Sequence, residues 1–330
     1  MLTLTPNGLY CKAGNFYIDP KGAVERAVIT HAHSDHARRG AKQYYCANSG
    51  RSLLHARLGK NIKSQSYAFG EKFQLGGVTL SFHPAGHILG SSQVRMEYQG
   101  EVWVASGDYK RDPDPTCEPF EVVKCDTFVT EATFGTPAYI WNKEADLGKE
   151  IYEWWSANAA QGKNSVLFAY SLGKAQRVLG LLEPYATRQV ICHSAATPLN
   201  ECYREQGVKL TPTRCLSTIE NNEHLEGELL LVPQSFLSTE QALILGDHYE
   251  TAFASGWMAT DHRGYDRGFL LSDHADWNDL LRTVQECGAK QVYVQHRGKG
   301  ALVRELNRMG IKAFPETALM RPESRQLSLF

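Results

Sequence analysis

The sequence lacks long apolar runs, paired cysteine motifs and a strong net charge. No apolar run approaches the ~18 residues of a membrane-spanning helix, and Met1–Tyr10 shows no basic segment followed by an apolar one. We therefore expect a cytoplasmic protein. None of the eight cysteines forms a C-x-x-C pair, which argues against a cysteine zinc site and favours buried, reduced thiols. The net charge of −1 offers a polyanion no global attraction.

Charge is nevertheless unevenly distributed along the chain. From Arg38 to Lys63 there are seven Lys/Arg and no Asp/Glu, whereas Cys215 to His262 holds eight Asp/Glu and no Lys/Arg. Two explanations stay open: two solvated faces of opposite sign, or a local surface for an anionic ligand beside the residues that precede Arg38.

The organisation of the 330 residues suggests an insertion, since roughly 150 residues per domain allows two domains. Short strands are predicted at 26–30, 78–83, 93–98, 101–105 and 127–130, and Gln99-Gly100 reads as a hairpin turn. Helical stretches then alternate with apolar runs, a pattern typical of a parallel sheet. A helix at 277–287 is predicted to follow a strand and precede another. We expect a first domain part at 1–139, an inserted domain at 140–262, a return segment at 263–320 and a tail at 321–330.

The strongest chemical signal directly follows the strand predicted at 26–30. His31, His33, Asp35 and His36 fall within six residues. A turn can present the pair His31/His33 to one ion and Asp35/His36 to another. Imidazole and carboxylate ligands suit Zn²⁺, and also Mn²⁺ or Fe, so the segment predicts a metal site.

Two strand-end residues extend this segment into an ordered series. His87 in PAGHILGSSQ follows His36 by 51 residues, and Asp108 in ASGDYK follows His87 by 21. The series resembles the ligand pattern of the metallo-β-lactamase superfamily. The resemblance implies an α/β fold of the αββα sandwich type.

The same resemblance implies roles for individual residues. It places His31, His33 and His87 on one ion, Asp35 and His36 on the other, and Asp108 between the two ions. Asp19 in FYIDP resembles the early aspartate that supports the H-x-H loop.

Three further motifs resemble the β-CASP branch, whose members are nucleases with a cap domain inserted in the lactamase fold. They are Glu131 in TEATFG, His274 in LSDHADW and His296 in VQHRGKG. His274 is the candidate general acid, because imidazole titrates near working pH. Glu131 would hold the tautomer of His274, and His296 would complete the second ion's shell. Asp35 is counted with His274 and Glu131 among the catalytic candidates.

A fourth stretch, FAYSLGKAQRVLGLL, resembles the phosphate-side helix start of that branch. Ser171, Lys174 and Arg177 would then bind phosphate near a helix N-terminus. The alternative is an ordinary solvated helix start. The basic run from Arg38 to Lys63 could also follow a strand's backbone into the site.

Nearly the whole chain resembles the bacterial ligase-associated DNA exonuclease family. The likeness is carried by TPNGLYCKAGNFYIDP, THAHSDHARRG, SGDYKRDPDP, LFAYSLGKAQR and YDRGFLLSDHADW. It implies two divalent metal ions (zinc or manganese, with iron also compatible) and single-stranded DNA degraded from the 5′ end in DNA repair. It also suggests an ATP-dependent DNA ligase and helicase repair system as partner. His296 is discordant, because eukaryotic DNA-cutting β-CASP enzymes resemble a pattern with valine there, whereas RNA-cutting members carry histidine.

Three alternatives to the DNA exonuclease therefore stay open. They are an RNA-processing nuclease, an inactive nucleic-acid-binding scaffold, and a small-molecule thioester or lactam hydrolase. Retention of the metal-ligand positions with Glu131 and His274 argues against the scaffold. The inserted domain argues against the small-molecule hydrolase.

The last five residues, QLSLF, resemble the peptide by which bacterial DNA enzymes dock on the sliding clamp. Leu329 and Phe330 would fill an apolar pocket while Gln326 makes polar contacts, with Leu327 between them. The alternative is an apolar tail packed on its own domain.

Overall fold

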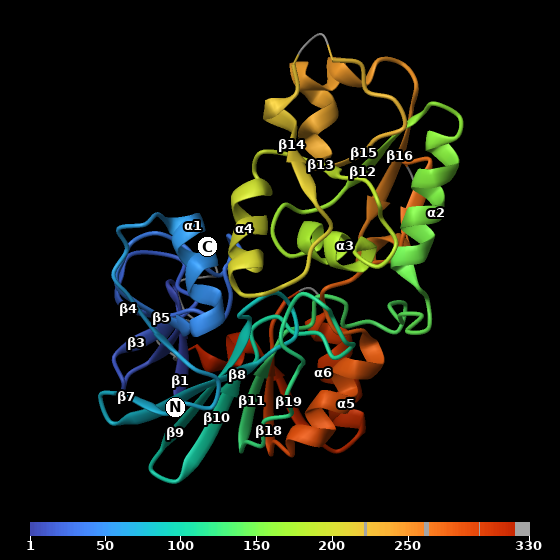
Figure 1. Ribbon diagram of the computed structural model, residues 1–330. Coiled ribbons are helices and arrows are strands. Elements are labelled where there is room, and N and C mark those ends of the chain that lie inside the picture. The colour runs from blue at the N-terminus through green and yellow to red at the C-terminus, as the bar shows by residue number, and fades with distance from the viewer. Residues whose placement is uncertain (221–222, 261–263, 297, 321–330) are drawn as a thin grey trace, which may run out of the picture. The chain divides into compact units, whose positions relative to one another are not determined.

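The computed structural model describes residues 1–220, 223–260, 264–296 and 298–320 (Figure 1). The chain forms two compact units. The first comprises residues 1–113, 117–139 and the chain from 274 onward, and the second comprises 114–116 and 140–273. Gln326, Leu327, Leu329 and Phe330 of the predicted clamp peptide lie outside the described residues.

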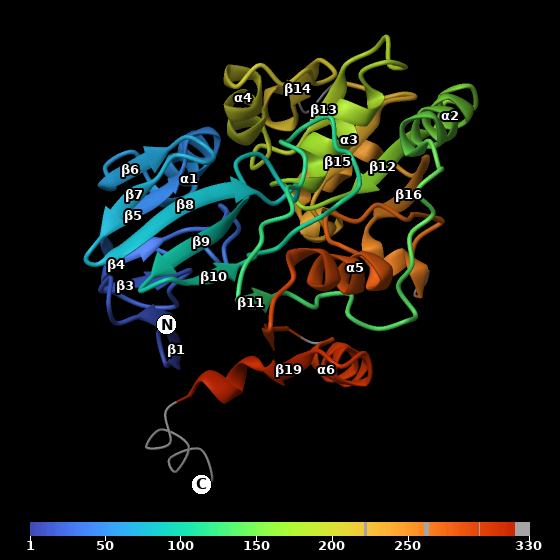
Figure 2. The ribbon, with the colours of Figure 1, turned by 90° about the horizontal axis from the view of Figure 1, so that it is seen from below.

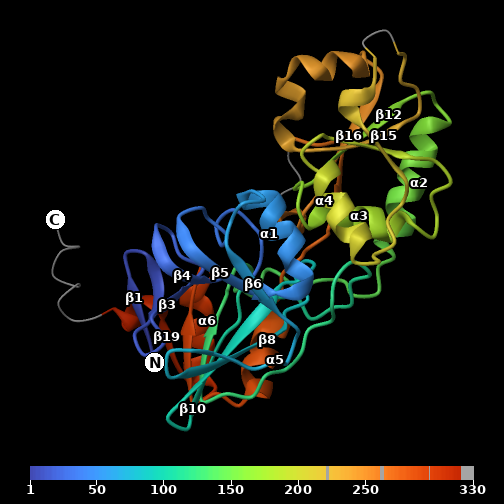
Figure 3. The same cartoon turned by 60° about the vertical axis from the view of Figure 1, so that its left-hand side comes forward.

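The N-terminal sheet of the first unit has six strands in chain order. They are β1 (Leu2–Thr5), β2 (Gly8–Cys11), β3 (Phe16–Ile18), β4 (Val24–Val28), β5 (Ala41–Ala47) and β6 (Ser64–Tyr67). Helix α1 (Arg51–Leu58) lies across β4, β5 and β6 (Figure 3). Its Leu54 and Leu58 pack in one cluster with Ala27, Tyr44 and Cys46, so the helix covers one face of this sheet.

The second sheet of this unit has seven strands in the order β19-β18-β11-β10-β9-β8-β7. Their bounds are β7 (Phe73–Leu75), β8 (Val78–Pro84), β9 (Ser92–Tyr98), β10 (Glu101–Ala105), β11 (Thr127–Thr130), β18 (Gln291–Val294) and β19 (Lys312–Pro315). One core cluster joins the two sheets, with Phe16 and Val28 from the first and Phe82 and Val129 from the second. Helices α5 (Trp277–Cys287) and α6 (Lys299–Arg308) cover the opposite face of the second sheet (Figure 2). The layers therefore run helix, sheet, sheet, helix.

Local sequence explains several of these elements. The predicted hairpin of β9 and β10 is confirmed, with Gln99 and Gly100 both at positive φ (52° and 79°), as a tight primed turn requires. Helix α5 begins where the Asp276 side chain accepts from the Asp279 backbone N–H, and ends at Gly288 in the left-handed conformation.

The second unit contains a six-stranded sheet in the order β14-β13-β15-β12-β16-β17, with every neighbouring pair parallel. The strands are β12 (Asn164–Phe168), β13 (Val190–Cys192), β14 (Thr213–Cys215), β15 (Leu229–Val232), β16 (Tyr249–Ala254) and β17 (Arg267–Phe269). The helices are α2 (Leu147–Ala159), α3 (Lys174–Leu182) and α4 (Thr197–Glu205). The expected boundary at 262 falls too early, because β17 pairs with β16 and the unit continues to Asp273.

The predicted α/β class is confirmed, and the strand predicted at 127–130 and the helix at 277–287 have the observed bounds. Helices α1 and α6 were not predicted. All eight cysteines are free, and those buried are Cys11, Cys46, Cys192, Cys202 and Cys287. Within the described part of the chain, no helix combines the length and apolar character needed to cross a bilayer.

Candidate metal centre

Loops that follow strands of the first unit carry the candidate ligands. The histidines of HAHSDH come after β4, His87 comes after β8, Asp108 after β10 and His296 after β18. Four different strands therefore position the candidate ligands. The strands are fixed by the shared apolar core, so the donors are held by a rigid scaffold.

The first donor group consists of His31, His33, His87 and Asp108. His33 Nδ1 lies 3.1 Å from His31 Nε2 and 3.0 Å from His87 Nε2. Asp108 Oδ2 lies 3.7 Å from His31 Nε2 and 3.9 Å from His87 Nε2. A tetrahedral zinc site with ligands at about 2.0–2.1 Å has donor separations of about 3.3 Å. The four donors therefore fit the size of a single zinc-like ion.

Hydrogen bonding around Thr30 fixes which nitrogen of His31 can bind a cation. The Thr30 hydroxyl lies 2.6 Å from Asp19 Oδ2 and donates its single proton to that carboxylate. His31 Nδ1 lies 3.0 Å from the same hydroxyl oxygen, so Nδ1 is the protonated nitrogen. Burial lowers the pKa of His31 well below its ordinary value, so the ring is neutral. The lone pair on Nε2 therefore points at the other donors.

The second donor group consists of His36, Asp108 and His296. His36 Nε2 lies 3.4 Å from Asp108 Oδ2, and His296 Nδ1 lies 3.9 Å from Asp108 Oδ1. Among the described residues, Asp108 Oδ1 is buried and has no hydrogen-bond partner. A buried carboxylate oxygen without a donor is costly. A second cation at this position would satisfy it, so the donor set fits two ions that share Asp108.

Asp19 supports this second group from behind. Its Oδ2 lies 2.7 Å from His36 Nδ1, which directs His36 Nε2 toward Asp108. Burial lowers the pKa of His36, but the charge of Asp108 and hydrogen bonds to Asp108 and Asp19 outweigh it and raise the pKa well above its ordinary value. For Asp108, burial raises the pKa, but His36, His274 and His31 together hold the pKa well below the usual range. The surroundings thus favour positive charge beside an ionised Asp108.

Two residues of this centre adopt left-handed backbone conformations that non-glycine residues rarely occupy. Asp19 has φ 45° and His296 has φ 66°. Such strain persists only where the surrounding structure imposes it, and it clusters at functional sites.

Asp35 is the predicted ligand that joins neither donor group. Its side chain is 71% exposed, although Oδ2 lies 3.7 Å from His36 Nε2. The short H-x-D-H spacing leaves Asp35 on the outer side of the turn, where water solvates its carboxylate. The structure therefore places Asp35 at the edge of the centre.

Glu131 and His274 form a pair beside the two donor groups. His274 Nδ1 lies 2.9 Å from Glu131 Oε2 and 3.1 Å from Oε1, and the Glu131 side chain is 1% exposed. The same carboxylate accepts from the Tyr109 N–H at 2.7 Å and from the Thr133 hydroxyl at 2.5 Å. These donors occupy both oxygens, which makes Glu131 an orienting acceptor. His274 Nε2 is then the nitrogen that can exchange a proton.

Thr133 is a functional residue that sequence reasoning missed. Its hydroxyl donates to Glu131, and the hydroxyl oxygen lies 3.0 Å from His296 Nδ1. Thr133 therefore links the Glu131–His274 pair to His296. Its position two residues after Glu131, in the same TEATFG motif, is the feature of the sequence that could have identified it.

The loop that carries His87 is held by residues that were also missed. Ser91 Oγ accepts from the backbone N–H of His87 at 3.0 Å and of Ile88 at 3.2 Å. Gly86 has φ 72°, and a Cβ there would meet the Lys110 carbonyl at 2.3 Å. Glycine is therefore required directly before this ligand.

The predicted phosphate-binding residues lie in the second unit and have intramolecular partners. Lys174 Nζ lies 2.7 Å from Asp273 Oδ1, and both side chains are 5% exposed. Arg177 Nε lies 3.2 Å from Asp114 Oδ2, and a terminal nitrogen donates to the Ser272 carbonyl. The Ser171 carbonyl accepts from Gln176. Lys174 and Arg177 thus pair with carboxylates of the same unit, as buried cations require, and are not part of a solvated helix start.

The known proteins that are similar to this chain match it over only part of their own length. The chain is 31% identical over 317 residues to a probable DNA ligase of Opitutus terrae, a match that covers 93% of this chain and 30% of the relative. It is 26% identical over 196 residues to an RNase J-like protein of Methanocaldococcus jannaschii, covering 51% of this chain and 45% of the relative. The chain thus spans about a third of the first relative and matches under half of the second. No protein-family model matches the chain.

A solved structure shares the fold. A protein of unknown function from Enterococcus faecalis superposes with a TM-score of 0.59 at 12% identity, over 88% of this chain and 79% of the other. At this identity the likeness concerns the fold alone.

Proposed function

Because the chain belongs to the β-CASP branch of the metallo-β-lactamase superfamily, we propose that it is a metal-dependent nuclease that hydrolyses phosphodiester bonds. The observation that carries the proposal is the pair of donor groups that share Asp108, with the Glu131–His274 pair beside them. This is the set of parts that a two-ion phosphodiester hydrolysis requires.

Two bound ions would activate a water molecule and offset the charge that develops on the phosphate. His31, His33 and His87 would hold one ion, His36 and His296 the other, and Asp108 would contact both. Asp19 and Thr30 fix the orientations of His36 and His31 before any ligand binds. Because these two rings are already oriented, they need not reorganise during the reaction.

In this proposal, His274 protonates the leaving oxygen. Its Nδ1 donates to Glu131, which leaves Nε2 as the atom that faces proton exchange. The hydrogen bond to the Glu131 carboxylate also stabilises the protonated ring, the form from which a general acid donates.

For the substrate, we propose single-stranded DNA degraded from the 5′ end, in repair together with a DNA ligase. The match of this chain to part of a probable DNA ligase supports that choice. RNA is the second candidate, supported by the likeness to an RNase J-like protein and by histidine at position 296. Docking of the C-terminal QLSLF peptide on the sliding clamp remains part of the DNA proposal.

The test compares single-stranded DNA and RNA of identical sequence, each labelled at the 5′ end, with Zn²⁺- or Mn²⁺-loaded protein. We expect short labelled DNA products from the earliest time points, with RNA intact. Cleavage of RNA alone would reverse the substrate assignment, and cleavage of neither polymer would overturn the nuclease proposal. Asp108→Asn controls for contaminating nuclease.

A further inference from the structure

The exposed cations of the first unit are concentrated between residues 38 and 63. This stretch holds seven Lys/Arg and no acidic residue. Only Lys42 has an acidic partner there within the described ranges, namely Glu25 at 2.6 Å. The cations that are exposed and form no ion pair with any described residue are Arg38, Arg39, Arg51, Arg57, Lys60 and Lys63.

Helix α1 brings these cations to the metal centre. Arg57 Nε donates to the carbonyl of Ala32 at 3.3 Å, and Ala32 lies between the ligands His31 and His33. At the other end of α1, Gly50 packs so closely on Gly90 that a Cβ on Gly90 would lie 2.1 Å from the Gly50 nitrogen. The helix is therefore attached to the two loops that carry the histidines of the first donor group.

The residues before and after α1 continue the same surface. A terminal nitrogen of Arg39 lies beside Gly59, the residue that follows the last turn of the helix. Arg38 lines a cavity of about 200 Å³ together with Asp35, His36 and His296. The cations thus extend from the cavity beside His36 and His296 to the C-terminal end of α1.

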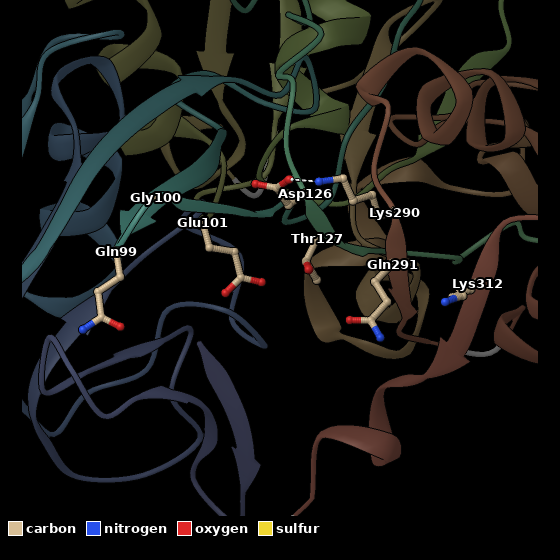
Figure 4. Close-up of a pocket in the computed structure, with 8 residues that line it drawn as sticks. All are labelled: Gln99, Gly100, Glu101, Asp126, Thr127, Lys290, Gln291 and Lys312. Atoms are coloured by element: carbon tan, nitrogen blue, oxygen red, sulfur yellow. Dashed lines mark hydrogen bonds and ion pairs between the residues drawn. The ribbon is translucent and has the colours of Figure 1, made fainter.

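Some cations elsewhere in the same unit are paired with carboxylates of the chain. Figure 4 shows a second cavity, of about 410 Å³, in which Lys290 points at Asp126 and Glu101 lies nearby. The Lys290–Asp126 distance is 2.8 Å, and Arg111 similarly pairs with Glu286 at 2.6 Å. These pairs contrast with the cations of residues 38–63, of which only Lys42 has an acidic partner among the described residues.

We propose that Arg38, Arg39, Arg57, Lys60 and Lys63, here called the basic surface, bind the phosphates of a single nucleic-acid strand and lead it to the metal centre. The proposal rests on the proposed nuclease function and gives that function a substrate path. It assigns strand binding to this surface in place of Lys174 and Arg177, whose charges are already matched by Asp273 and Asp114.

The physical consequence is a salt-dependent affinity. Each phosphate contact releases counterions, so the slope of log affinity against log salt changes by about 0.7 per contact for a single strand. Removing three contacts should lower the slope by about 2 and weaken binding roughly tenfold to a hundredfold at moderate salt. Such contacts carry no sequence information, so the loss should be equal for strands of different sequence.

The experiment measures binding of a labelled 20-nucleotide single strand over a series of salt concentrations. The Asp108→Asn chain is used throughout to prevent cleavage, and DNA and RNA are tested in parallel. The variant Arg39→Gln/Lys60→Gln/Lys63→Gln is compared with Lys12→Gln/Lys72→Gln/Lys312→Gln. The second triple removes the same charge from exposed residues of the same unit. Urea unfolding of both triples is compared with that of the Asp108→Asn parent chain to check that they fold.

We expect only the first triple to show the lower slope and the weaker binding. An unchanged slope in that triple, or an equal loss in the second triple, overturns the proposal. A larger effect with one polymer identifies that polymer as the strand that the surface binds. Hydrolysis of bis(p-nitrophenyl) phosphate by the wild-type chain tests the nuclease function separately. If the protein binds strands through the basic surface but hydrolyses no diester, the strand-binding inference stands and the nuclease proposal is overturned.

Discussion

Lys174 in the second unit and Asp108 in the first are both charged and almost completely buried, yet the chain surrounds them differently. Lys174 is 2.7 Å from Asp273, so its charge is matched within the protein. Asp108 faces four histidines from three loops and keeps one oxygen without a hydrogen bond to any described residue. A closed ion pair indicates a structural role. Histidine and carboxylate lone pairs that converge without hydrogen-bond donors indicate a cation-binding site.

Removing the charge of Asp108 should have the largest effect. Asp108→Asn keeps the shape of the side chain but removes the anion that both donor groups share. We expect metal content to fall and nuclease turnover to drop about a thousandfold or more, because the ions supply several kcal/mol of catalysis. Metal analysis and single-turnover cleavage check this. Asp126→Asn is the control, since Asp126 pairs with Lys290 in the same unit. Full metal content in Asp108→Asn would contradict the shared-ligand role.

Breaking the Lys174–Asp273 ion pair should lower the stability of the protein rather than its metal binding. Lys174→Met leaves Asp273 buried without its cation, and we expect the free energy of unfolding to fall by about 3–5 kcal/mol. Lys174→Met/Asp273→Asn should recover part of this loss. Urea unfolding followed by circular dichroism measures both. Lys149→Met, in the exposed pair with Glu153, should change stability by less than about 1 kcal/mol. If Lys174→Met were as stable as wild type, the pair would not be a structural element.

A smaller effect is expected from changing Asp19, which supports His36 in the candidate metal centre. Asp19→Asn weakens the hydrogen bond that orients His36. Removal of such a partner typically lowers metal affinity 10- to 100-fold. Titration of metal-free protein with Zn²⁺ should show the larger loss in one of the two binding steps, since Asp19 contacts His36 directly and His31 only through Thr30. An equal loss in both steps would point to a general distortion of the HAHSDH loop.

The smallest expected effect concerns the link between Glu131 and His296. Thr133→Val removes the hydroxyl that contacts both Glu131 and His296, at a cost of about 1 kcal/mol, or roughly fivefold in turnover. Thr133→Ser keeps the hydroxyl and should retain wild-type turnover and pH profile. If serine behaves like valine, the effect comes from packing and the proposed link is wrong.

Much of the first unit could be predicted from local patterns. The strand at 127–130, the hairpin at Gln99-Gly100 and the helix at 277–287 depend on near neighbours, so apolar period and turn residues were sufficient. Helix α1 was not predicted, because it is only eight residues long and polar residues separate Leu53 and Leu54 from Leu58. The extension of the second unit to Asp273 depends on the pairing of β17 with β16, which is a long-range contact.

The sequence by itself determined the chemistry of the metal centre, because three histidines and an aspartate within six residues, followed by His87 and Asp108, specify nitrogen and oxygen ligands in a fixed order. Only the tertiary structure decided how those residues are used. It left Asp35 exposed, joined Thr133 to Glu131 and His296, and matched Lys174 with a carboxylate 99 positions away. The physical reason is that ligand identity is a property of each side chain, whereas charge matching and tautomer depend on neighbours that are distant in the chain.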